Sequence, residues 1–153
     1  MWSITKGAGL AGTGFRSTGE PGIVGRDSGS TDAVDLAVTA ARAADAKMGI
    51  DTVVLEMGSL LGVTDAFVIT AGANARQVRT LVDEVERQVA LAGGRSPNRV
   101  EGLSEARWVL MDYGDFIVHV FLDEAREYYS LERLWGNAEK ISWKPASASV
   151  RGK

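Results

Sequence analysis

Apolar side chains recur at helical spacing between residues 34 and 48, and this period predicts the first helix. Its apolar face would be made by Val34, Ala37, Val38, Ala41, Ala44 and Met48. Ser30 or Thr31 can cap its start, and Gly49 can end it. The residues before it are crowded with glycine and serine and show no sustained period. The sequence therefore predicts a disordered leader over residues 1–30.

Residues 52–57 and 66–72 form two short apolar runs rich in β-branched side chains, which predicts two strands joined by a loop. A second helix follows them. Its apolar stripe would consist of Val78, Leu81, Val82, Val85 and Val89. Asn74 is suited to cap this helix at its start, and Gly93 with Gly94 would end it.

The segment from Trp108 to Leu122 reads as a β-hairpin. If Tyr113 and Gly114 form a two-residue turn, three cross-strand pairs follow: Asp112 with Asp115, Leu110 with Ile117, and Trp108 with His119. These pairs would share one side of the hairpin. The other side would carry Val109, Met111, Phe116 and Val118.

A closing helical region is expected from Asp123 or Ser130 to about Lys140, followed by a flexible tail over residues 144–153. The predicted order is helix, two strands, helix, two strands, helix. That order predicts one α/β domain over residues 31–143, with a mixed β-sheet covered by helices.

Composition narrows the possible functions. The chain of 153 residues lacks cysteine and has one histidine, which excludes disulfides, cysteine-bound metals and multi-histidine sites. No apolar stretch approaches a membrane span and no signal peptide is recognisable, so a soluble cytoplasmic protein is expected. Residues 31–143 hold 11 Lys and Arg against 18 Asp and Glu, a net charge of −7. Such a domain suits a basic protein partner better than a phosphate backbone, and no direct nucleic-acid specificity is expected.

Two glycine motifs suggest nucleotide chemistry, and neither is complete. Residues 7–12 match GxGxxG, but no strand precedes the glycines and no helix follows them, so dinucleotide binding is not expected. Gly58-Ser59 followed by Asp65 is typical of nucleotidyltransferases. That chemistry needs a second carboxylate at the alternate position, where this chain has Phe67.

Four hairpin residues leave more than one interpretation open. Asp112 and Asp115 could hold a metal as a pair, although acids flanking an exposed turn are the simpler explanation. His119, in an apolar strand without a nucleophile motif, is expected to be a half-buried residue near Trp108. Spacing alone favours core packing and an interface anchor equally for Trp108.

Specific stretches of the chain resemble a known family. DAFVITAG, VEG, WVLMDYGD, VHVF, AREYYSLE and LW are similar to segments of the ribosomal silencing factors, the RsfS or Iojap-like proteins, and the resemblance covers residues 31–143. It implies a nucleotidyltransferase-like topology without the catalytic acids. It also implies binding of the large ribosomal subunit at protein L-fourteen, which blocks association with the small subunit and lowers translation under nutrient limitation.

The same resemblance implies a non-enzymatic protein without cofactor or metal, and possible homodimers of the free protein. Carried over residue by residue, the partner-binding positions are Trp108, Leu110 and Asp112, with Tyr113, Asp115 and Tyr128 as secondary ones. Glu101, Arg126 and Glu132 also fit family motifs, and a salt bridge between the hairpin and the last helix would explain them equally well. Two alternatives remain: a nucleotidyltransferase-like enzyme, and a dimeric interaction module with another partner.

Overall fold

The computed structural model describes residues 21–145, and side chains from residue 33 onward. Its helices are α2 (Pro21–Ala46), α3 (Gly58–Leu61), α4 (Ala75–Leu91), α5 (Asp123–Tyr129) and α6 (Leu131–Leu134). Its strands are β1 (Ile50–Glu56), β2 (Ala66–Gly72), β3 (Arg99–Glu101), β4 (Trp108–Asp112), β5 (Phe116–Leu122) and β6 (Glu139–Lys140). None of these helices is both long enough and apolar enough to span a lipid bilayer.

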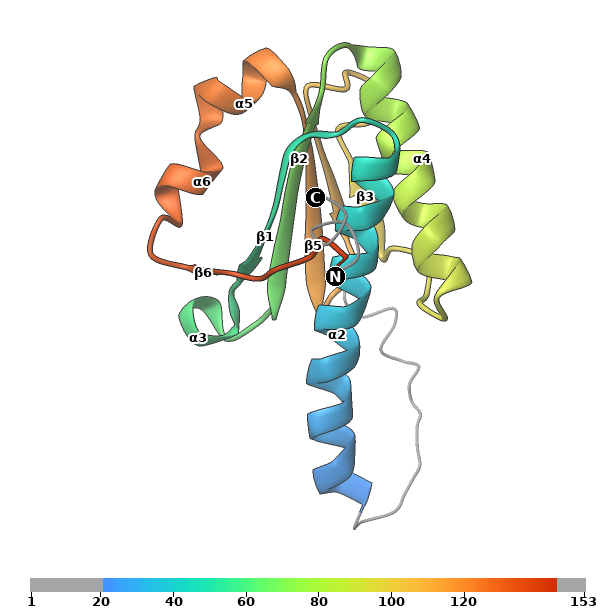
Figure 1. Ribbon diagram of the computed structural model, residues 1–153, viewed down its shortest axis with the longest axis vertical. Coiled ribbons are helices and arrows are strands. Elements are labelled where there is room, and N and C mark those ends of the chain that lie inside the picture. The colour runs from blue at the N-terminus through green and yellow to red at the C-terminus, as the bar shows by residue number, and fades with distance from the viewer. Residues whose placement is uncertain (1–20, 146–153) are drawn as a thin grey trace, which may run out of the picture.

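The strands form one six-stranded sheet in the order β3-β4-β5-β2-β1-β6. Only the central pair β2 and β5 is parallel, and the other neighbouring strands are antiparallel. The helices α2 and α4 cover one face of the sheet, while α5, α6 and α3 lie on the other side (Figure 1). The predicted α/β fold with a mixed, helix-covered sheet is confirmed.

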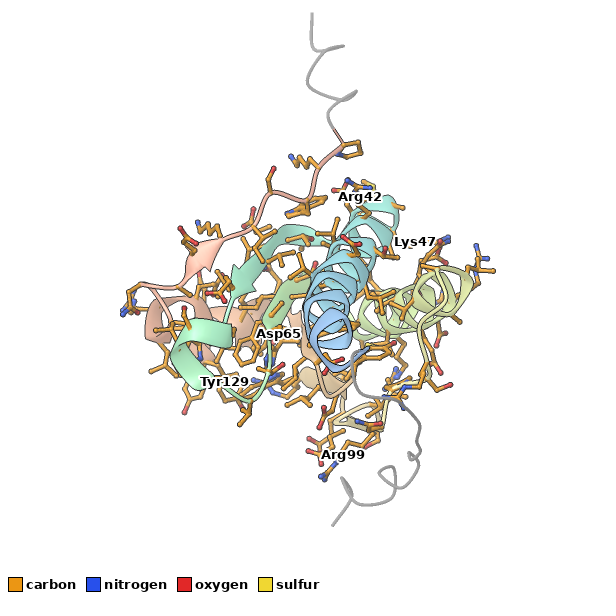
Figure 2. The ribbon with its side chains drawn as sticks, turned by 90° about the horizontal axis from the view of Figure 1, so that it is seen from below. Arg42, Lys47, Asp65, Arg99 and Tyr129 are labelled. Carbon is orange, nitrogen blue, oxygen red and sulfur yellow. The ribbon has the colours of Figure 1, made fainter. Side chains whose placement is uncertain are left out.

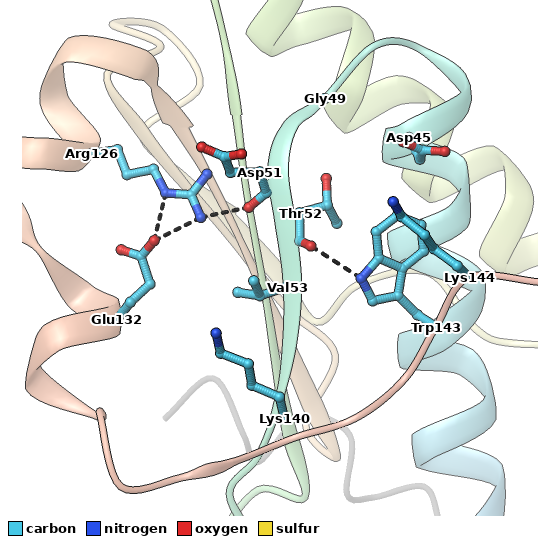
Figure 3. A pocket seen from close by; sticks show the side chains of 10 residues that line it. All are labelled: Asp45, Gly49, Asp51, Thr52, Val53, Arg126, Glu132, Lys140, Trp143 and Lys144. Atoms are coloured by element: carbon cyan, nitrogen blue, oxygen red, sulfur yellow. Dashed lines mark hydrogen bonds and ion pairs between the residues drawn. The ribbon is translucent and has the colours of Figure 1, made fainter. Parts of the chain in front are cut away.

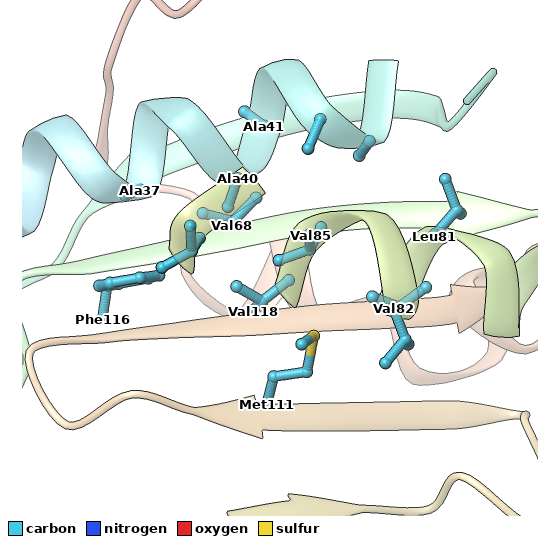
Figure 4. Close-up of a cluster of buried hydrophobic side chains, with 14 of the residues drawn as sticks. Ala37, Ala40, Ala41, Val68, Leu81, Val82, Val85, Met111, Phe116 and Val118 are labelled. Carbon is cyan, nitrogen blue, oxygen red and sulfur yellow. The ribbon is translucent and has the colours of Figure 1, made fainter. Parts of the chain in front are cut away.

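The larger core lies between the sheet and the pair α2 and α4 (Figure 4). Helix α2 contributes alanines, among them Ala37, Ala40 and Ala41, which are all completely buried. Small side chains let the helix backbone approach the sheet closely. The valine stripe of α4 fills the remaining space, and its N-cap is Asn74, whose carboxamide oxygen accepts from Gln77 N at 2.9 Å. The predicted stripe and cap of this helix are confirmed.

A second, smaller core covers the opposite face of the sheet. It consists of Leu55, Met57, Phe67, Ile69, Ala71, Phe121 and Leu131. Half-buried side chains surround it, including Trp108, Ile117 and Trp135. Strand β2 is buried along its whole length because it contributes to both cores, which explains why its sequence is almost continuously apolar.

The first helix differs from its prediction at both ends. It begins at Pro21 rather than Ser30, so the predicted start of this helix was wrong and residues 21–30 are helical. Proline suits the first turn of a helix, where its missing N–H is not needed. At the other end, Met48 has a φ of 68° and is 75% exposed, because the helix stops at Ala46. Met48 therefore does not extend the apolar face. The disorder predicted for residues 1–20 lies outside the described residues.

The C-terminal region also departs from the predicted single helical stretch. Ser130, with a φ of 48°, separates α5 from α6, and residues 139–140 pair with β1 as an edge strand. Trp143 then packs into the larger core and donates from Nε1 to the Thr52 carbonyl at 3.0 Å. The predicted tail begins directly after this residue, and only Lys144 and Pro145 of it are described, both exposed.

Candidate functional site

One side of the β4–β5 hairpin faces away from α2 and α4, and we call it the hairpin face. It carries Trp108, Leu110, Asp112, Ile117, His119 and Phe121. The observed pairs are Trp108 with Phe121, Leu110 with His119, and Asp112 with Ile117. The predicted pairs were therefore wrong by two residues.

The error in register comes from the position of the turn. Tyr113 N donates to the Phe116 carbonyl at 3.0 Å, so Gly114 and Asp115 are the two turn residues. Gly114 has a φ of 88°, a conformation that favours glycine. A shift of two residues leaves every side chain on its predicted face, because side chains alternate with a period of two.

Asp112 stabilises this turn rather than facing Asp115. Its carboxylate accepts from Gly114 N at 2.8 Å, and the side chain is only 6% exposed. Replacement of Asp112 by lysine would remove this turn contact, so such a variant would not separate a loss of binding from a loss of folding. Asp115 is exposed. Within residues 33–145 no three acids or histidines gather in a way that could hold a metal.

Trp108 lies in an aromatic cluster at the α5 end of the hairpin face. Its ring stacks on Phe121 with centroids 5.1 Å apart and touches Tyr129 with centroids 4.7 Å apart. Its Nε1 donates to Nδ1 of His119 at 3.1 Å. The half-buried Trp108 is thus both packed and oriented, so its two proposed roles, core residue and interface anchor, are compatible.

His119 is a fixed acceptor for this hydrogen bond. Because Nδ1 accepts, the ring proton must sit on Nε2, which is buried and has no partner among the described residues. The side chain is 4% exposed, and burial lowers the pKa of His119 to about 3. The imidazole therefore stays neutral at physiological pH, as the interpretation of a buried packing residue requires.

This buried histidine predicts a pH-dependent stability. In the unfolded chain the pKa of His119 returns to 6.5, so the unfolded state takes up a proton first as pH falls below that value. Stability is complete above the unfolded pKa and is lost as pH falls toward the folded one. Between about pH 7 and pH 5 we expect this group alone to remove about 2 kcal/mol from the free energy of unfolding.

His119→Asn is the matched variant for this measurement. The carboxamide oxygen of Asn can replace Nδ1 as the acceptor for Trp108, yet Asn does not titrate. Urea denaturation at the two pH values should show wild type losing about 2 kcal/mol more than His119→Asn. Equal losses in the two proteins would contradict the burial of a neutral histidine.

The other predicted contact residues differ in their position and in their exposure to solvent. Leu110 is half-buried on the hairpin face, Asp115 is exposed at its turn, and Tyr128 of α5 is 78% exposed. Tyr113 lies in the larger core on the opposite face, where it stacks on Phe116 with centroids 4.5 Å apart. Burial raises the pKa of the Tyr113 hydroxyl. Trp108, Leu110 and Asp112 thus share the hairpin face, although Asp112 is buried. Asp115 lies at the turn, Tyr128 lies on α5, and Tyr113 faces the opposite core.

The hydrogen-bond donors of Ser59 in the Gly-Ser loop are already bound to a carboxylate of the same chain. Ser59 donates from its hydroxyl to the Glu56 carboxylate at 2.8 Å, and its N–H points to the same carboxylate at 3.3 Å. The position where a transferase would need its second acid is Phe67, a core residue that is 6% exposed. The loop therefore lacks both a free phosphate-binding backbone and a carboxylate pair.

Arg126 connects α5 to the sheet and lies beside a hollow on the β1 side (Figure 3). Its guanidinium donates to the carbonyls of Ile50 at 2.7 Å and Asp51 at 2.6 Å, and it pairs with Glu132 at 2.7 Å. The predicted salt bridge between the hairpin and the last helix is not what Arg126 and Glu132 form, since their ion pair joins α5 to α6. Glu101 was grouped with them wrongly, since it pairs with Arg99 on its own strand.

Sequence reasoning missed one exposed apolar feature. Leu60, Leu61 and Val63 lie in and just after α3, a segment that was assigned only to a loop. The run Leu60-Leu61-Gly62-Val63 was the available signal, because three large apolar residues are unusual in a surface loop.

Comparison with known proteins points to one family. The family model described as ribosomal silencing factor during starvation matches residues 30–153. The ribosomal silencing factor RsfS of Bacillus subtilis is 43% identical over 99 residues, which cover 65% of this chain and 83% of that protein. RsfS of Halalkalibacterium halodurans is 39% identical over 107 residues, covering 70% and 91%.

A more distant relative and a crystal structure also match this chain. Mouse mitochondrial assembly of ribosomal large subunit protein 1 is 30% identical over 104 residues, covering 67% of this chain and 44% of that protein. A crystal structure of a Chromobacterium violaceum protein superposes with a TM-score of 0.65 at 31% identity. The match covers 76% of this chain and 95% of that one.

Proposed function

Because this chain belongs to the ribosomal silencing factor (RsfS) family, we propose that it binds the large ribosomal subunit through its hairpin face. The contact would be with ribosomal protein L-fourteen in the cytoplasm. By occupying the joining surface, the bound protein would block the small subunit and lower translation under nutrient limitation. A relative whose name refers to large-subunit assembly supports the choice of subunit.

The observation that carries this proposal is the uncovered part of the hairpin face. Trp108, Leu110 and Ile117 are half-buried there, on the side of the sheet that α2 and α4 leave free. Apolar and aromatic side chains held on a rigid sheet are suited to anchor a protein interface. The adjoining surface is acidic: Asp115 lies at the turn, and Asp123, Glu124 and Glu127 are exposed on α5. Together these features fit a basic protein with apolar side chains.

Members of this family act as ribosome silencing factors and not as enzymes, so the protein works by binding. We further infer that the sheet has a nucleotidyltransferase-like topology from which the catalytic acids are missing, an inference supported by Phe67 at the acid position. A second copy of the chain could use the same hairpin face when no ribosome is present. Such a homodimer would compete with subunit binding.

Leu110→Arg tests the hairpin face directly. The half-buried Leu110 lies on strand β4, where arginine can extend to solvent while placing a positive charge opposite a basic partner. We expect large-subunit binding to weaken about 30-fold or more, the loss typical of an interface anchor. The measurement is co-sedimentation with purified large subunits, together with light scattering to follow subunit joining.

The control variant is Asp83→Lys, which reverses an exposed charge on α4, on the opposite side of the sheet. It should bind as wild type does. Circular dichroism verifies that both variants are folded. Folded Leu110→Arg that still sediments with large subunits like wild type would move the contact away from the hairpin face.

A further inference from the structure

The segment from Met57 to Asp65, which we call the α3 corner, exposes three large apolar side chains. Leu60 is 41% exposed, Leu61 is 37% exposed and Val63 is 82% exposed. Single exposed apolar residues are common on proteins, but a group of three within four positions marks an interaction site more often.

The α3 corner is held rigid by its surroundings. At its start Met57 is completely buried, and the Glu56 carboxylate accepts from the Ser59 hydroxyl at 2.8 Å. Gly62, with a φ of 77°, ends the short helix by donating to the Gly58 carbonyl at 3.1 Å. A preorganised apolar surface loses little entropy on binding. The backbone that carries the three side chains is therefore held in place.

The α3 corner is also attached to the hairpin turn. Asp65 N donates to the Asp115 carbonyl at 2.7 Å, and the Thr64 hydroxyl donates to the same oxygen at 2.9 Å. In Figure 1, α3 lies at the end of the sheet opposite α5, on the side that α2 and α4 leave free. Viewed from below, Asp65 and Tyr129 lie across α2 from Lys47 (Figure 2). The corner thus extends the hairpin face beyond its turn.

The negative charges around the α3 corner indicate which kind of partner could bind there. Glu56, Asp65 and Asp115 lie together, and the pKa of Asp65 is raised by burial first and then by the charges of Asp115 and Glu56. An RNA phosphate would be repelled by this group. A second copy of the chain would bring the same three acids against it. A basic protein surface is the occupant whose charge is complementary.

We propose that the α3 corner is a second contact site, continuous with the hairpin face, which binds a basic protein surface carrying apolar side chains. Leu60, Leu61 and Val63 would make the apolar contacts, while the neighbouring acids pair with lysines or arginines of that partner. This inference rests on the proposed function, because the basic surface would belong to the same ribosomal partner. It adds a contact on a different structural element.

The test uses a pair of substitutions at the most exposed position. Val63→Lys and Val63→Asp both remove the apolar contact, and they introduce opposite charges. A basic partner repels the lysine, so we expect Val63→Lys to weaken large-subunit binding about tenfold or more, and Val63→Asp to weaken it less. Leu91→Lys and Leu91→Asp are the controls, because Leu91 is 69% exposed at the end of α4. Both should bind as wild type does.

Full-length variants are compared by co-sedimentation with large subunits, and sedimentation velocity reports the oligomeric state of the free protein. Tighter binding of Val63→Lys with weaker binding of Val63→Asp would mean an RNA contact and would overturn the proposal. A change in dimerisation with unchanged subunit binding would assign the corner to a second copy, which also overturns it.

Leu110→Arg separates this inference from the proposed function. If Leu110→Arg loses binding while both Val63 variants bind like wild type, the α3 corner is not a contact and the hairpin face still is. If none of the three variants changes binding, the proposed function itself fails.

Discussion

Replacement of Gly102 by alanine should destabilise the protein by about 3 kcal/mol or more, since two costs add at this position. The first is conformational: Gly102 has a φ of +86°, where a side chain is disfavoured. The second is steric: a Cβ atom would lie 2.2 Å from the backbone carbonyl oxygen of Trp108. That oxygen belongs to strand β4 and cannot move without shifting the hairpin. The substitution should therefore also displace Trp108 and weaken subunit binding.

Gly93→Ala provides the matched comparison. Gly93 has a φ of +96°, but an added Cβ would meet no atom within 4 Å. Only the conformational cost remains there, about 1–2 kcal/mol. Urea denaturation of both variants measures the difference, which isolates the clash with Trp108. Equal free energies of unfolding for Gly102→Ala and Gly93→Ala would show that β4 can shift away from the added Cβ without loss of stability.

Elements with strong local signals were predictable from the sequence. Strand β2 begins and ends where its apolar run does, and α4 has its expected cap and stripe. The short strands β3 and β6 were not predicted, because two or three residues show no measurable period and pair only through contacts with distant strands. Ser130 was one of the two possible helix starts, and it is the N-cap of α6. Nothing in the local pattern, however, requires Ser130 to be left-handed and to separate α6 from a helix before it.

The candidate surface was predictable in part. Alternation along the hairpin assigned Trp108 and Leu110 to one face correctly even though the turn was misplaced, because the error was an even number of residues. The burial of Asp112 was not predictable. It depends on the Gly114 N–H and on the packing of neighbouring strands, which a single sequence does not reveal. The exposure of Val63 likewise depends on how α3 meets the hairpin turn.

Arg126 is expected to be the most important polar side chain for the attachment of α5. It is 7% exposed, and its guanidinium contacts two backbone carbonyls of β1 and the Glu132 carboxylate at the same time. One of those carbonyls belongs to Asp51, which has a φ of 46°. A planar group with several fixed donors can satisfy all three acceptors, whereas a single ammonium cannot. Arg126 therefore stabilises both the irregular start of β1 and the junction of α5 with α6.

Arg126→Lys should lower the free energy of unfolding by about 3 kcal/mol, because at least one buried carbonyl loses its charged donor while the positive charge remains. Arg133→Lys is the control: Arg133 is exposed on α6, so its replacement should cost almost nothing. Urea denaturation followed by circular dichroism compares the two variants. Since α5 carries Tyr129, whose ring contacts Trp108, a loosened α5 should also increase the solvent exposure of Trp108, which is measured as a red shift in fluorescence after Trp2, Trp135 and Trp143 are replaced by phenylalanine. If Arg126→Lys were as stable as Arg133→Lys, α5 would be held mainly by apolar packing rather than by the guanidinium.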